Sequence, residues 1–172
     1  LSEKIAEKQE SPYIRYDNNI IPHRAGAFTL HARFFVEEQI PMNLDGIKRV
    51  ILPIEVSPET VKRISSEGIE TAIEVPVAVF SNADKYIEKL TALKACGADL
   101  AWVCNLDGVG IAEKAGIPFA SGFGMNIYNS VSLEEIKNLG ASDGLISCEM
   151  TLSDASRLGG DIPRGAMIYG RI

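Results

Sequence analysis

The sequence predicts an α/β fold, an incomplete TIM-barrel-like parallel sheet of about seven strands, on three observations. From position 46 onwards a glycine recurs every 19 to 29 residues, followed by an apolar run, a polar loop and a helix-like stretch. The runs are apolar on both faces, as expected for parallel strands covered by helices. Successive βαβ crossovers build an open sheet or a barrel. Because a complete eight-fold barrel takes about 250 residues, 172 residues favour an incomplete one.

The strands are expected at regular places. The first lies within 28–35 (FTLHARFF), which has the β-branched and aromatic bias of a strand. Each of the next six follows one of the recurring glycines, where a left-handed C-cap ends the preceding helix. The glycines are Gly46, Gly68, Gly97, Gly116, Gly140 and Gly160, and the runs are 47–56, 69–80, 98–105, 117–124, 141–149 and 161–170.

The helices are expected between these runs, at 61–68, 83–97, 109–116, 132–140 and 152–160. Ser57-Pro58 offers an N-cap followed by proline at the first helical position. Residues 132–135 (SLEE) predict a capping box, and 151–154 (TLSD) a weaker relative. These signals place short crossover helices between successive strands.

Two parts of the chain differ in character. Residues 1–26 predict an N-terminal helix and linker, and residues 27–172 the α/β domain. Because the chain begins with leucine and not methionine, we expect a fragment of a longer protein.

Composition limits the classes of function. The net charge of −6 argues against nonspecific wrapping of nucleic acid, which requires Lys and Arg to neutralise phosphates. Cys96, Cys104 and Cys148 lack zinc-site spacing, so we expect reduced thiols in a cytoplasmic protein and no metal site. The apolar runs are too short for the ~20 residues of a membrane span.

The candidate binding residues lie in the loops after the strands, because ligands of such folds gather at the carboxyl ends of strands. Asn129 or Ser130 could instead cap the following helix, and Glu149 could be a solvated loop acid. Glu74 is either near a strand end or a buried, paired carboxylate. The substrate-binding candidates are Asn105, Asn126, Asn129, Ser130, Glu149, Tyr169 and Arg171.

The residues identify no catalytic group. His31 could serve a nucleophile, but there is no G-x-S-x-G elbow or recognised cysteine motif, which favours a structural histidine. Residues 108–116 (GVGIAEKAG) hold the position of a phosphate loop, yet Glu113 replaces its third glycine and Asp107 would repel an anion.

Three short motifs stand in the last fifty positions. They are Phe123, Gly124, Asn126, Asn129 and Ser130, then Ser147 and Glu149, then Tyr169, Gly170 and Arg171. These resemble the D-F-G-L-N-x-F-N-S, L-S-P-E-L and Y-G-R runs of peptidase family U-32, the collagenase-like proteases of bacteria. The likeness covers about residues 28–172.

The resemblance implies a TIM-barrel-like core and a choice of function. Members are described as peptidases, and others are needed for hydroxylation of RNA or of a quinone precursor, several with a four-iron, four-sulfur cluster on four cysteines. The three cysteines here do not match those positions, so we expect no cofactor in this fragment and a cluster only in its full-length parent. Gly122 also replaces the family's usual aspartate.

We therefore expect a fragment of a U-32 protein that is inactive by itself because part of the site is missing. The parent would be a peptidase or a cluster-dependent hydroxylation factor acting on RNA, a peptide or a quinone precursor. The alternative is a noncatalytic substrate-binding or assembly module. Its partners would be the remainder of the parent or, through an exposed sheet edge, a second copy in a homodimer.

Overall fold

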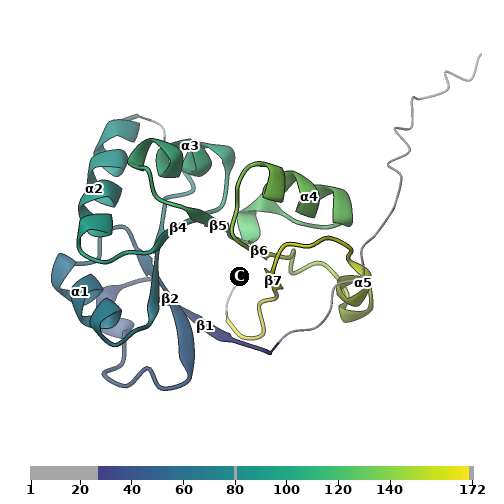
Figure 1. The fold of residues 1–172 in the computed structure, drawn as a ribbon, viewed down its shortest axis with the longest axis horizontal. Helices are drawn as coiled ribbons and strands as arrows, with labels where there is room; N and C mark the ends of the chain where they lie inside the picture. The colour runs from purple at the N-terminus through teal and green to yellow at the C-terminus, as the bar shows by residue number, and fades with distance from the viewer. Residues whose placement is uncertain (1–26, 80, 171–172) are drawn as a thin grey trace, which may run out of the picture.

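The computed structural model describes residues 27–79 and 81–170. Seven strands form one sheet in chain order, and every neighbouring pair is parallel. The sheet curls into a half-barrel with helices on its outer side, and β1 and β7 border the opening (Figure 1). The predicted fold class and strand number are confirmed. The predicted helix and linker within 1–26, and Arg171, lie outside the described residues.

The elements alternate along the chain as the sequence predicts. The strands are β1 (Leu30–Arg33), β2 (Ile47–Pro53), β3 (Glu70–Glu74), β4 (Leu100–Val103), β5 (Phe119–Ser121), β6 (Gly144–Leu145) and β7 (Arg164–Gly165). The helices are α1 (Pro58–Ser66), α2 (Ala83–Ala95), α3 (Leu106–Ala115), α4 (Ser130–Asn138) and α5 (Leu152–Arg157), with short 3₁₀ turns η1 (Glu37–Gln39) and η2 (Phe123–Met125).

Local signals account for most of the helix ends. All six recurring glycines have φ between 65° and 116°, the left-handed region that a helix C-cap uses. Ser57 caps α1 with proline next to it, and Thr151 caps α5 by accepting a hydrogen bond from the Asp154 N–H.

Two helices begin earlier than predicted. The capping box of α4 is formed by Asn129 and Ser132, not by residues 132–135, because the Asn129 side chain already accepts a bond from the Ser132 N–H at 2.8 Å. Similarly, Asn105 caps α3 by accepting from the Gly108 N–H at 2.8 Å, so that helix starts at Leu106. In both cases an asparagine before the predicted start is the stronger N-cap.

The sheet is buried on both faces. The outer face packs against the helices, and its fully buried members include Val50, Leu52, Ile73 and Val103. A smaller cluster fills the concave face, formed by Ile51, Ala72, Leu100, Trp102, Cys104 and Ala120. The runs that the sequence showed to be apolar on both faces are therefore strands covered on both sides. None of the helices described is long and apolar enough to cross a bilayer.

Candidate functional site

The mouth of the half-barrel, at the carboxyl ends of the strands, holds a partly buried ion pair between aromatic rings. Arg33 at the end of β1 donates to both carboxylate oxygens of Glu74 at the end of β3, from Nε at 2.7 Å and from Nη2 at 2.6 Å. The guanidinium carbon lies 4.4 Å from the ring centre of Phe35 and 5.4 Å from that of Phe123. Glu74 is thus both at a strand end and paired, and Arg33 is held on three sides.

The wall beside this pair requires a glycine at position 122. A Cβ added there would lie 2.6 Å from both Trp102 Nε1 and Cys104 Sγ. Backbone φ is −83° at Gly122, so the requirement comes from close packing and not from backbone strain. The aspartate that the U-32 motif carries here has no room, because the Trp102 and Cys104 side chains occupy its place. The buried Nε1 of Trp102 has no hydrogen-bond partner among the residues described.

Cys104 is placed at the mouth but is a poor nucleophile. Burial raises the pKa of its thiol, and the Gly124 N–H and nearby Arg33 only partly offset this. A thiol with a raised pKa stays protonated near neutral pH, and the thiolate is the reactive form. His31, the other candidate for nucleophilic chemistry, lies near the opposite end of the sheet, two positions before Arg33 on β1.

Six of the seven predicted binding residues lie in the described part of the chain, and they divide into two groups. Asn105 and Asn129 are helix caps, and Asn105 Nδ2 also donates to the Val77 carbonyl, which ties two rim loops together. Ser130 accepts a bond from the Gly159 N–H at 3.0 Å and so joins α4 to the segment after α5. The amide and hydroxyl groups of these three residues serve the architecture of the rim. For Asn129 this is the capping role that the sequence left open, whereas the cap formed by Asn105 was not predicted.

The other three candidates that the structure describes face solvent. Asn126 follows η2 with φ 49°, the left-handed region that asparagine tolerates, and is exposed. Glu149 is exposed in the loop after β6, and Tyr169 is 96% exposed after β7. The structure brings Asn126 and Asn129 into one loop, between β5 and α4.

Exposed apolar side chains around the rim are the feature that the sequence reasoning missed. After six of the seven strands, the loop or the first residue of the next helix presents at least one large exposed apolar side chain, whereas the middle turns of the described helices present none. Two of them directly follow an N-cap residue, Leu106 after Asn105 and Leu152 after Thr151. Their place at the start of a helix is the sequence feature that could have identified them as rim residues. The rim residues are Phe35, Val36, Val77, Leu106, Tyr128, Leu152, Met167, Ile168 and Tyr169.

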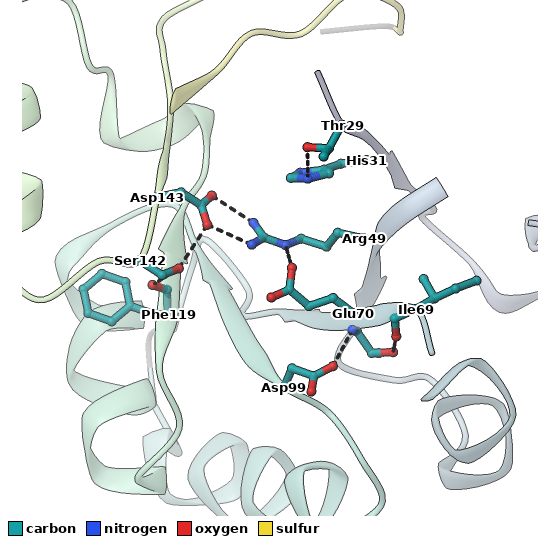
Figure 2. Close-up of polar contacts among 10 residues, drawn as sticks. Thr29, His31, Arg49, Ile69, Glu70, Asp99, Phe119, Ser142 and Asp143 are labelled. Atoms are coloured by element: carbon teal, nitrogen blue, oxygen red, sulfur yellow. Dashed lines mark hydrogen bonds and ion pairs between the residues drawn. The ribbon is translucent and has the colours of Figure 1, made fainter. Parts of the chain in front are cut away.

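A second polar cluster lies at the amino-end of the sheet (Figure 2). Arg49 on β2 donates to Glu70 on β3 and, with Nη1 and Nη2, to both oxygens of Asp143 at 2.8 Å. His31 bonds to Thr29, and partial burial and the neighbouring Arg49 lower the pKa of its ring. In parallel barrels this end of the sheet serves stability and not catalysis.

The cysteines do not fit the iron–sulfur cluster that the U-32 resemblance implies for some full-length proteins. Cys96 ends α2, Cys104 follows β4 and Cys148 follows β6, and all three are unpaired. A four-iron, four-sulfur cluster takes four thiolates. Within the described part of the chain, no three His, Cys, Asp or Glu side chains converge as metal ligands.

Comparisons with known proteins support the fold. No protein-family model and no curated protein matches the sequence. The structure is similar to that of the U32 peptidase Mk0906, with a TM-score of 0.59 and 8% identity over 84% of this chain and 70% of that one. A 4-hydroxy-2-oxoglutarate/2-dehydro-3-deoxyphosphogluconate aldolase from TTHB1 has a TM-score of 0.42 at 14% identity, over 67% of this chain and 57% of that one. A rubisco-like protein from Alicyclobacillus acidocaldarius has a TM-score of 0.47 at 13% identity, over 83% of this chain and 50% of that one.

Proposed function

We propose that this chain is the substrate-binding half-barrel of a U-32-type protein and that it binds a polypeptide across its carboxyl-end rim. The observation that carries this is that nine of the thirteen large exposed apolar side chains described lie around the rim. Single exposed apolar residues are normal on a protein surface, whereas their concentration at one end of the sheet favours an interaction site. The fold likeness to a U32 peptidase supports the same choice of ligand.

The rim offers the contacts that an extended polypeptide needs. Apolar side chains such as Leu106 (65% exposed) and Tyr128 (51% exposed) can take up side chains of the ligand. Burying them on binding contributes roughly 25 cal/mol for each Å² of apolar surface removed from water. Asn126, Glu149 and Tyr169 lie among them, and their amide, carboxylate and hydroxyl groups can pair with peptide N–H and C=O groups.

Catalysis is assigned to parts of the protein beyond these residues. Cys104 is buried and protonated, and the carboxylate of Glu74 is occupied by Arg33. We therefore expect binding without cleavage by this chain, in a cytoplasmic protein whose cysteines stay reduced. A complete peptidase is the second candidate, favoured by the fold neighbour.

A role of the parent in hydroxylation is a weaker alternative. Its iron–sulfur cluster would have to come from cysteines beyond this chain. RNA as the ligand is disfavoured because the rim loops expose the carboxylates of Glu55, Asp107 and Glu149, which repel phosphates.

Binding of denatured collagen peptides by the full chain tests the proposal. Leu106→Ser and Tyr128→Ser should weaken binding measured by fluorescence anisotropy, by about tenfold for each residue that forms a hot spot. Leu139→Ser is the matched control, since Leu139 is 44% exposed but lies at the far end of α4. Equal effects of all three substitutions would contradict the rim site. Cleavage of the peptide would favour the complete peptidase instead.

A further inference from the structure

We infer that the Arg49–Asp143 ion pair is a clamp that sets how far the open half-barrel is spread, which makes both residues positioning residues for the rim. This inference builds on the proposed function. It starts from an unusual feature of the sheet: β1 and β7 are its two edges in the structure described, so no ladder of hydrogen bonds closes it. A side-chain contact that crosses the interior can then help to hold its curvature.

The pair crosses the interior between distant strands. β2, which carries Arg49, lies four strands from β6, which follows Asp143, so the two face each other across the curl. In an eight-stranded barrel the interior is just wide enough for side chains to fill. Because one arginine and one aspartate span it here, the half-barrel already has the curvature of a nearly closed barrel.

The geometry of the pair suits a clamp. Both guanidinium Nη atoms donate to the two oxygens of Asp143, which fixes distance and angle together. The side chain of Arg49 is only 7% exposed and that of Asp143 18%, so water screens the pair little. The Ser142 hydroxyl donates to Asp143 Oδ2 at 3.0 Å and orients the carboxylate further.

A matched pair exists within the same cluster. Glu70 also accepts from Arg49, but it lies on β3, which is already bonded to β2 along five residue pairs. Losing the Glu70 carboxylate removes the same charge from the same arginine without releasing a distant strand. Figure 2 shows the two carboxylates on different sides of the guanidinium. Asp143 should therefore control the spread of the sheet, and Glu70 should not.

Double electron–electron resonance, which measures the distance between two spin labels on the full chain, tests the clamp. Labels go on Leu30→Cys and Ala166→Cys, beside the two edges, in a Cys96→Ser, Cys148→Ser background that leaves buried Cys104 in place. Asp143→Asn should lengthen and broaden the distance distribution, whereas Glu70→Gln should leave it unchanged. Arg49→Lys keeps the charge but loses the bidentate contact, so it should also lengthen the distance between the labels. This variant replaces Asp143→Asn in the test if Asp143→Asn does not fold.

The second readout is the affinity for denatured collagen peptide. Asp143→Asn should weaken it about tenfold through misplaced rim loops, and Asp143→Glu should restore most of the loss. An unchanged label distance in both Asp143→Asn and Arg49→Lys, or equal lengthening in Glu70→Gln, would overturn the clamp. A lengthened distance with unchanged affinity would overturn the positioning role. If the unsubstituted chain binds no peptide, the proposed function fails while the distances still decide the clamp.

Discussion

Replacing Gly122 by alanine tests the close packing at the mouth. The new Cβ would meet Trp102 Nε1 and Cys104 Sγ at 2.6 Å, closer than real Cβ atoms come to other heavy atoms. Trp102 is 4% exposed and Cys104 3%, so neither side chain can swing into solvent. Overpacking of this kind costs about 1–3 kcal/mol. The reduced freedom of the unfolded chain offsets about 0.4–1 kcal/mol of this, which leaves a net loss of at most about 2.6 kcal/mol, with a central value of about 1.3 kcal/mol.

Gly110 provides the control for this prediction. It lies within α3 with nothing within 4 Å of an added Cβ, so Gly110→Ala should stabilise the protein by about 0.5–1 kcal/mol. Urea unfolding measures both values. The double variant Gly122→Ala, Trp102→Phe, which removes the Nε1 edge, should show a favourable coupling between the two sites. If Gly122→Ala is as stable as Gly110→Ala, the described packing of Trp102 against residue 122 is wrong.

Three further predictions concern capping, thiol reactivity and pH. Asn105→Ala should cost about 0.5–2 kcal/mol in urea unfolding, since it removes the α3 cap and the bond to the Val77 carbonyl. Iodoacetamide should modify exposed Cys148 much faster than buried Cys104, and mass spectrometry measures both rates; equal rates would contradict the burial of Cys104. Hydrogen bonds from Ser57 and Thr60 lower the pKa of Glu37 in the folded protein. The ionised Glu37 therefore stabilises the fold at pH values above the ordinary glutamate pKa of about 4.3. This stabilisation is lost as the pH falls through the lowered pKa of the folded state. Glu37→Gln should make the free energy of unfolding depend less on pH in this acidic range.

The architecture could be read from the sequence because its signals are local. A glycine such as Gly68 or Gly116 lies just past a helix end, where a left-handed conformation is needed, and its position depends on nearby residues alone. The apolar runs identify parallel strands by composition. Helix starts were less certain, because Asn105 and Asn129 could not be separated from substrate-binding residues by type: asparagine suits both roles.

The partners of charged side chains could not be read in the same way. Arg33 and Glu74 are 41 positions apart and Arg49 and Asp143 are 94 apart, and the sequence contains nothing that pairs them. Only the curl of the sheet brings them together. The apolar rim was missed for another reason. Residues such as Leu152 look like ordinary core positions until the fold shows that their loops face solvent.

The most direct test of the account is to map where the chain binds a ligand. Amide chemical shifts of the full, isotope-labelled chain would be followed by NMR during titration with a denatured collagen peptide. The account predicts that shifts change in the loops after the strands, at Val77, Leu106 and Tyr128 above all, and stay constant around Leu139 and on the outer faces of the helices. Changes confined to those outer faces, or to the amino-end cluster around Arg49, would contradict it.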